Sequence, residues 1–376
     1  MPIPFIDLAT QFKQQKHEIE VAIQNVLDHG QYIMGPEVKE LESRLSDYIG
    51  VKHTLACSSG TDALVLPLMS RNLKASDAVF TSPFTFFASA ESISLAGATP
   101  VFVDIDPDTY NIDTSALAAK IDDVITEGKL TPRGIVPVDL FGMAADYDSI
   151  KPIAEKYDLF VLEDAAQSFG APYKGKRAGS LGDCAATSFY PAKPLGCYGD
   201  GGAVFTNDSD LYEQMQSLRV HGQAMSGDKY DNVRIGINAR MDTIQAAILL
   251  EKLKIYDQEI DMRNQVAERY TTLLDGSVQT PYIPEGQGSV WAQFTVQSDD
   301  REKIREQLQN DDIPTAVFYP IPIHLSTAYK HLGYKQGDFP VSEAASERVF
   351  SLPMHPYLSD QEIISITDSI KRAIDS

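Results

Sequence analysis

The chain has 376 residues, of which 43% are hydrophobic, and this is ample for a large buried core in one major and one smaller domain. Its formal net charge of −21 argues against nonspecific binding to nucleic acid or to an anionic membrane, because phosphate groups repel such a surface. No segment reaches the ~18 continuous apolar residues of a membrane span, and no basic region precedes an apolar stretch at the start, so we expect a cytoplasmic protein.

Short apolar runs alternate with helical patterns through the first part of the chain. We predict five strands at about 54–57, 78–82, 100–104, 135–138 and 159–163. This alternation favours an α/β fold with a mostly parallel sheet and helices on both faces. Two more strands, 185–190 and 203–206, are close in sequence, which predicts a hairpin-like return at one edge of the sheet. Loops at the carboxyl ends of the strands would then form the ligand site.

The remaining residues predict a long helix and a smaller domain. Apolar residues recur at helical spacing from 242 to about 274, and this helix would lead into the second domain. Beyond it we predict strands at 291–296 and 315–319 and helices at 301–309 and 360–374. We therefore divide the chain into a large domain, 1–250, with an N-terminal arm, and a small C-terminal domain, 251–376.

Three cysteines, Cys57, Cys184 and Cys197, leave at least one thiol unpaired. They lack the Cys-x-x-Cys spacing that is typical of metal ligands, so we expect no metal site. A reducing cytoplasm fits this pattern.

A lysine and an aspartate each follow a predicted strand. Lys193 lies just before Gly199-Asp200-Gly201-Gly202, and Asp164 ends the apolar run at 160–163. Pyridoxal phosphate (PLP) needs an amine for a Schiff base, a carboxylate beside its pyridinium nitrogen, and donors for its phosphate. Asp164 would keep the ring nitrogen protonated and Lys193 would move the substrate proton. Gln167 could donate to the ring oxygen, or be an ordinary exposed glutamine at a helix start.

Small polar residues follow the first predicted strand and precede a helical stretch. The backbone amides of Gly60, Thr61 and Asp62, with the Thr61 hydroxyl, would offer donors and a positive helix end to a phosphate. Ser188 could add another hydroxyl. The alternative is a plain helix N-cap.

Taken together, these stretches resemble the DegT/DnrJ/EryC1/StrS sugar aminotransferases over nearly the whole chain. The resemblance is carried by residues 5–8, 30–38, 59–64, 163–168 and 236–242. It implies a fold type I PLP-dependent transferase, like aspartate aminotransferase, with a seven-stranded sheet in the large domain and an α+β small domain. It also implies a homodimer with shared active sites, a nucleotide sugar as substrate, and L-glutamate as the donor that leaves as 2-oxoglutarate.

The resemblance implies a role for each matching residue, with Lys193 as the catalytic Schiff-base lysine. The cofactor would be held by Gly60, Thr61, Phe86, Asp164, Gln167, Ser188, Lys193 and, from the neighbouring subunit, Asn238. Phe86 would stack on the ring; its alternative is a buried core aromatic, the interpretation that we keep for Phe84 and Phe87. The substrate would meet Tyr32, Arg240, Phe318 and Tyr319.

Residues 193–202 and 319–322 resemble one branch, the UDP-2-acetamido-2-deoxy-3-oxo-glucuronate aminotransferases. Those enzymes aminate C3 of a UDP-linked keto sugar on a route to surface polysaccharide. The alternative is the same chemistry on another 3-keto or 4-keto nucleotide sugar. Phe318 departs from the branch, which carries histidine there, and so loses two ring nitrogens. His324 lies nearby and is interpreted as an ordinary loop residue.

Arg240 is the candidate ligand for the carboxylates of glutamate and of a uronic acid. A guanidinium binds a carboxylate at two points, which lysine cannot copy. The alternative is that Arg240 pairs with Asp242 or lies on a solvated face. The resemblance favours contact with the substrate.

Three other functions compete with this interpretation. A nicotinamide-binding enzyme would need a Gly-x-Gly-x-x-Gly after a first strand, which the sequence lacks. A noncatalytic sensor of the PLP type would need an attached DNA-binding module and a basic face. A sugar dehydratase of the superfamily would carry histidine in place of Lys193.

Overall fold

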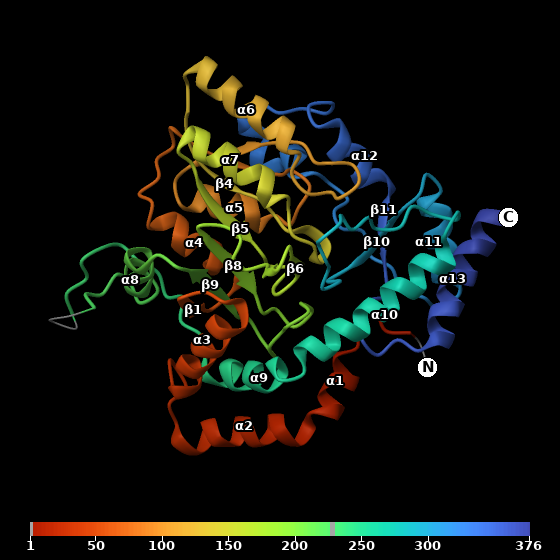
Figure 1. Ribbon diagram of the computed structural model, residues 1–376, viewed down its shortest axis with the longest axis horizontal. Coiled ribbons are helices and arrows are strands. Elements are labelled where there is room, and N and C mark those ends of the chain that lie inside the picture. The colour runs from red at the N-terminus through yellow and green to blue at the C-terminus, as the bar shows by residue number, and fades with distance from the viewer. Residues whose placement is uncertain (1–2, 226–229) are drawn as a thin grey trace.

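The structure is a computed structural model that describes residues 3–225 and 230–376. Figure 1 shows a central sheet with helices around it and a second group of elements that contains the C-terminus. Helix α10 runs from the first group to the second, and the N-terminal end of the chain lies beside the second group. In the described part of the chain, no helix is long and apolar enough to cross a membrane.

The central sheet has seven strands in the order β1-β9-β8-β5-β4-β2-β3. Their bounds are His53–Cys57 (β1), Gly202–Thr206 (β9), Cys184–Ser188 (β8), Phe160–Asp164 (β5), Thr131–Val136 (β4), Asp77–Thr81 (β2) and Thr99–Phe102 (β3). Strand β9 is antiparallel to both of its neighbours, and the other pairs are parallel. The mostly parallel sheet predicted from the sequence is confirmed. The prediction that the β8–β9 return lies at the edge of the sheet is wrong, because β1 pairs with β9 and is itself the edge strand.

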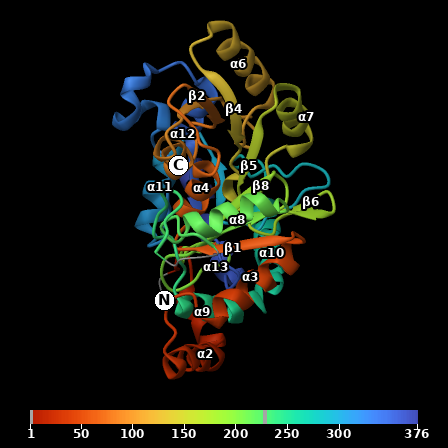
Figure 2. The same ribbon diagram turned by 90° about the vertical axis from the view of Figure 1, so that its left-hand side faces the viewer.

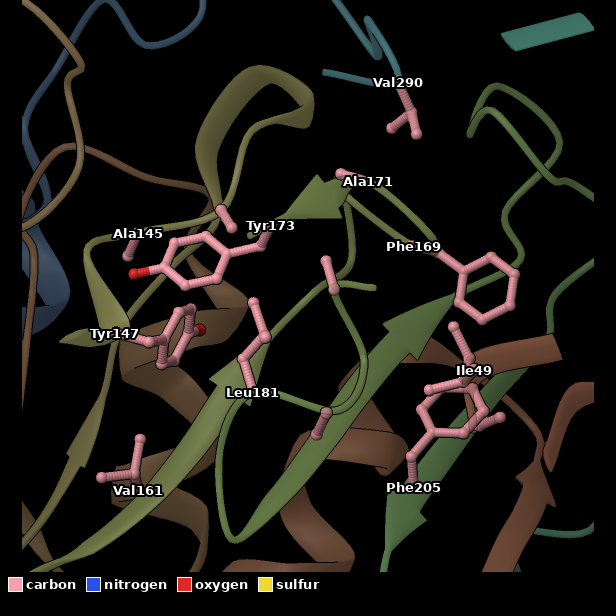
Figure 3. Packing of buried hydrophobic residues seen from close by; sticks show 14 of the residues in the cluster. Ile49, Ala145, Tyr147, Val161, Phe169, Ala171, Tyr173, Leu181, Phe205 and Val290 are labelled. Carbon is pink, nitrogen blue, oxygen red and sulfur yellow. The ribbon is translucent and has the colours of Figure 1, made fainter. Parts of the chain in front are cut away.

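Alternate strand residues face two separate hydrophobic clusters, one on each side of the sheet. On β9, for example, Phe205 belongs to the larger cluster and Val204 to the other. Figure 3 shows part of the larger cluster, in which Phe205, Phe169 and Ile49 lie together. The helices of the large domain are α1 Leu8–Gln14, α2 Lys16–His29, α3 Pro36–Ile49, α4 Gly60–Met69, α5 Ala88–Leu95, α6 Thr114–Glu127, α7 Tyr147–Tyr157, α8 Ser209–Leu218 and α9 Thr243–Leu253. Figure 2 shows most of them from the side.

The long helix predicted over 242–274 is two helices, α9 and α10 (Tyr256–Leu274), which are separated at residues 254–255. The small domain has its own hydrophobic cluster, whose buried members begin at Val266. The boundary proposed at residue 250 lies inside α9, and Tyr256 and Ile260 of α10 still pack in the larger cluster beside the sheet, so the exact division stays a proposal. Ile3 of the N-terminal arm packs against the same cluster.

The small domain holds a two-stranded antiparallel sheet of β10 (Phe294–Gln297) and β11 (Val349–Leu352). Its other helices are α11 Arg301–Asn310, α12 Pro340–Arg348 and α13 Asp360–Asp375. The strand predicted over 315–319 is wrong: only an isolated bridge joins Ala316 to Ser351. Pro314 and Pro320 flank this segment, and proline has no backbone N–H to give to a ladder. The remaining short elements are β6 Pro172–Tyr173, β7 Lys176–Arg177, and the 3₁₀ turns Leu140–Gly142, Ile323–Leu325 and Thr327–Leu332.

Candidate active site

Asp164 lies at the carboxyl end of β5 and is 3% exposed. Its Oδ2 accepts a hydrogen bond from the Ser89 hydroxyl at 2.7 Å, and its Oδ1 accepts one from the Ala166 amide at 3.2 Å. Burial raises the pKa of this carboxyl above its ordinary value, while the two hydrogen bonds and the charge of Lys193 oppose that shift. The carboxyl is therefore fixed in direction and electrostatically linked to Lys193.

Lys193 lies in the loop between β8 and β9, and its backbone amide donates to the Tyr190 carbonyl at 2.8 Å. Burial lowers the pKa of its amine to about 8, and the charge of Asp164 partly offsets this effect. An amine with this pKa is partly unprotonated near neutral pH, so it can act as a nucleophile or a base. The two residues singled out first in the sequence are thus brought together.

Helix α9 holds the loop that follows Lys193. The Lys252 amine, 1% exposed, donates to the Gly196 carbonyl, and the Gln245 side chain accepts from the Tyr198 amide at 2.9 Å. Lys252 also lies 4.7 Å from the centre of the Tyr198 ring. Sequence reasoning missed Lys252, because a lysine in an amphipathic helix is ordinarily on the solvent side.

The turn after β1 lies against the end of β8. A Cβ added to Gly60 would lie 2.6 Å from the Ser188 Cβ, so only glycine fits this contact without a shift. Ser59 is the N-cap of α4, and its side chain accepts from the Asp62 amide at 3.1 Å. The expectation that the Asp62 amide is a phosphate donor is therefore wrong. The amides of Gly60 and Thr61, at the first two helical positions, have no intrahelical partner.

Gln167 and Tyr319 form a second wall of the site. The Gln167 side chain, 3% exposed, accepts from the Phe141 amide at 2.8 Å and donates to the Tyr319 hydroxyl at 3.1 Å. The alternative of an exposed glutamine at a helix start is wrong, because Gln167 is buried in a turn. The Phe141 backbone N–H can bond only to the oxygen of the Gln167 side chain. The side-chain nitrogen of Gln167 therefore faces the Tyr319 hydroxyl. The Tyr319 hydroxyl can then donate its own hydrogen outward.

Phe86 is 58% exposed, and its ring centre lies 6.4 Å from that of Tyr319. The alternative of a buried core aromatic is therefore wrong for Phe86. It is right for Phe84, which is fully buried, and Phe87 packs partly buried against a core cluster. An exposed aromatic face beside Tyr319 is what a stacked ring requires.

Tyr32, Asn238 and Arg240 are the remaining predicted residues. Within residues 3–225 and 230–376, no hydrogen bond or ring contact joins them to Lys193 or Asp164. Tyr32 is 49% exposed, and its carbonyl accepts from the amide that begins α9, that of Thr243, at 2.8 Å. The carbonyl of Ala239 accepts from the Ser58 amide at 3.1 Å, which fixes the segment beside the turn after β1.

Arg240 donates through Nε to the Asn238 side-chain oxygen at 2.9 Å. In the described residues it forms no ion pair, so the expected alternative of a pair with Asp242 is not observed. Phe318 is partly buried, and its ring lies 6.4 Å from that of Phe5 in the N-terminal arm. His324 is buried in a 3₁₀ turn, and its Nε2 bonds the Glu343 carboxylate at 3.1 Å.

These residues fit pyridoxal phosphate. A buried carboxyl and a lysine of lowered pKa share one site, and two free helix amides and the Ser188 hydroxyl lie at the end of the adjoining strand. Asp164 would meet the ring nitrogen, Lys193 the aldehyde carbon, and the α4 end the phosphate.

The structure and the sequence together place the chain among known proteins. The model of the DegT/DnrJ/EryC1/StrS aminotransferase family matches residues 13–371. The chain belongs to this family. The resemblance seen in the sequence is thereby confirmed, and the protein is a PLP-dependent nucleotide-sugar aminotransferase.

Three similar proteins illustrate the family. The UDP-2-acetamido-2-deoxy-3-oxo-D-glucuronate aminotransferase of Pseudomonas aeruginosa is 48% identical over 364 residues, which cover 96% of this chain and 97% of that protein. The crystal structure of a DegT DnrJ EryC1 StrS aminotransferase from Brucella abortus has a TM-score of 0.96 at 49% identity, and 100% of both chains is covered. NtdA from Bacillus subtilis, solved with bound cofactor PMP, has a TM-score of 0.87 at 30% identity and covers 99% of this chain and 83% of its own. PMP is the amino form of PLP, and the predicted cofactor is confirmed.

Proposed function

We propose that this aminotransferase moves the amino group of L-glutamate to C3 of 3-keto UDP-N-acetylglucosaminuronic acid, for surface polysaccharide synthesis. The observation that carries the proposal is the 48% identity, over nearly the full length of both chains, to the Pseudomonas aeruginosa enzyme named for that substrate. The neutral 3-keto and 4-keto nucleotide sugars are the competing substrates.

The chain's own residues have separable roles in this proposal. When bound, PLP supplies a ring that accepts the electron pair left when a substrate C–H bond loses its proton. Lys193, with its lowered pKa, would take that proton from the substrate carbon and deliver it to the cofactor carbon on the other side of the transferred nitrogen. Asp164 holds the charge on the ring nitrogen, and the Gly60 and Thr61 amides hold the phosphate. Gln167 is the proposed donor to the cofactor's ring oxygen, and its side-chain nitrogen also bonds the Tyr319 hydroxyl at 3.1 Å.

Arg240 is the proposed ligand of the substrate carboxylates. Among residues 3–225 and 230–376, its guanidinium bonds only the neutral Asn238 side chain, through Nε, and this leaves both terminal nitrogens for a two-point contact. The same arrangement serves glutamate and the uronic acid, which use the site in turn.

Arg240→Lys tests this role, because it keeps the charge and loses the two-point geometry. We expect kcat/KM for the uronic sugar to fall by about 10- to 100-fold, and by much less for the neutral 3-keto sugar. Arg234→Lys is the matched control, since Arg234 is an exposed arginine whose terminal nitrogen bonds the Gln214 carbonyl. Equal losses on uronic and neutral sugars would rule out the proposed contact.

A homodimer with shared sites and a cytoplasmic location complete the proposal. Large apolar side chains are exposed, among them Phe86 and Tyr190 at the site and Ile235, which is 87% exposed, elsewhere on the surface, and a second copy of the chain would cover them. Asn238 is exposed and would reach the partner's phosphate. Light scattering of the purified protein tests the dimer, which a monomer mass would contradict. All three cysteines are free and buried, which is consistent with a reducing compartment.

A further inference from the structure

A chain of two buried hydroxyls leads to Asp164. The Ser89 hydroxyl lies 2.7 Å from the Asp164 Oδ2, and the Thr85 hydroxyl lies 3.2 Å from that of Ser89. Ser89 and Thr85 are each 2% exposed, so no bulk water competes for these bonds. Both belong to the segment that begins α5, whereas Asp164 ends β5, 75 residues later. The contact is made by the fold and has no local signal in the sequence.

The direction of each hydrogen bond follows from the donors that are present. An ionised carboxylate has no hydrogen, so Ser89 must donate to Asp164. Ser89 has then used its only hydrogen, and Thr85 must donate to the Ser89 oxygen. With the Ala166 amide on Oδ1, each oxygen of Asp164 has one donor, which fixes the plane of the carboxylate.

The same turn also positions Phe86. The Ser89 amide donates to the Phe86 carbonyl at 3.2 Å, so the exposed ring and the buried hydroxyl lie on one short segment. One turn of backbone therefore connects Phe86, the proposed stacking residue, to Ser89, the hydroxyl donor of Asp164.

We infer that Ser89, supported by Thr85, is a positioning residue that keeps the Asp164 carboxylate oriented and ionised for the ring nitrogen of pyridoxal phosphate. This inference rests on the proposed role of Asp164. Without the hydroxyl, one carboxylate oxygen loses its donor in a buried site, where such a loss is costly.

The electrostatic consequence has a definite sign. Burial raises the pKa of Asp164, and the Ser89 bond is the first of the effects that lower it. Lys193, Tyr319 and Tyr147 are titratable groups whose charges interact with Asp164, and the buried carboxyl residues Glu163 and Asp139 adjoin it. Removal of the hydroxyl must therefore raise the pKa of Asp164 further, and more of the carboxyl is neutral as the pH falls.

Ser89→Ala is the test, with Ser92→Ala as its matched control. Ser92 is also buried in α5, and its hydroxyl donates to the Ser89 carbonyl at 3.2 Å and not to Asp164. For Ser89→Ala we expect kcat to fall about tenfold with KM for both substrates nearly unchanged, and the acid limb of the kcat profile to move to higher pH. In the apoprotein, the dissociation constant of PLP should rise more at pH 6 than at pH 8.

Two further variants keep the test decisive. Thr85→Val preserves shape and removes the supporting donor, so it should give the same changes on a smaller scale. Ser89→Thr keeps the hydroxyl and should restore the wild-type pH profile. The inference is overturned if Ser89→Ala and Ser92→Ala behave alike. It is also overturned if Ser89→Ala raises the dissociation constant of PLP by no larger a factor at pH 6 than at pH 8. Unchanged behaviour of Asp164→Asn would overturn the proposed role of Asp164 as well.

Discussion

At the scale of single residues, the site depends on two buried groups that shift each other's protonation. Burial disfavours the charged form of both, and each charge opposes the effect of burial on the other. Lys193 and Asp164 were predictable from the sequence because each follows an apolar run at a strand end. Ser89 was not, because nothing local in its sequence indicates a bond to a residue 75 positions away.

Lys193 should capture PLP with a pH dependence that reports its lowered pKa. Only the unprotonated amine attacks an aldehyde, so the capture rate of the apoprotein should rise up to about pH 8 and level off above it. Asp164→Asn removes the charge that raises this pKa, so its midpoint should fall below that of the wild type. Stopped-flow absorbance measures both, and a wild-type midpoint near 10.5 would contradict the account.

At the scale of elements, the strands of the sheet were predictable from the sequence, but the helix break and the long-range contact that holds the Lys193 loop were not. Apolar runs marked all seven sheet strands to within two residues at their carboxyl ends. The run at 315–319 forms only an isolated bridge, and Pro314 and Pro320, which have no backbone N–H, stop a ladder from extending at either end of it. The break between α9 and α10 has no glycine or proline to mark it. The bond from Lys252 to the Gly196 carbonyl spans 56 residues, and it supports the loop that carries Lys193.

Lys252→Met tests the support that α9 gives to this loop. Methionine fills a similar volume without a donor, so the buried Gly196 carbonyl loses its partner at a cost of about 1–3 kcal/mol. We expect PLP affinity to fall about tenfold, as measured by spectral titration of the apoprotein. Lys254→Met is the control, because Lys254 is exposed and pairs only with Glu251 in the described residues. Equal affinity in the two variants would show that the support is dispensable.

At the scale of the whole molecule, acidic groups are abundant outside and also present in the core. Glu163 and Asp139 are both fully buried. Glu163 precedes Asp164 in the sequence, and the Asp139 amide donates to the Asp164 carbonyl. The Glu163 carboxyl accepts from the amides of Gly179, Leu181 and Gly182. Burial nevertheless raises its pKa to about 7. The fold therefore holds this group protonated over a range in which the unfolded chain would ionise it.

The stability of the protein should consequently fall as the pH rises through this range. The contribution of Glu163 is complete below its unfolded pKa of 4.5 and is lost as the pH passes about 7. Between pH 5.5 and 8.5, the unfolding free energy of the wild type relative to Glu163→Gln should fall by about 2 kcal/mol. Urea denaturation at both values measures it. A difference that stays constant or grows with pH would contradict the assignment.

The most direct test of the central claim is the absorbance of the PLP-loaded protein through one full cycle. We predict that glutamate changes the cofactor's band, and that 3-keto UDP-N-acetylglucosaminuronic acid then restores it, faster than the neutral 3-keto or any 4-keto sugar does. Lys193→Ala should show neither change at a comparable rate. Restoration by a 4-keto sugar alone would contradict the proposed substrate, and full cycling in Lys193→Ala would contradict the proposed site.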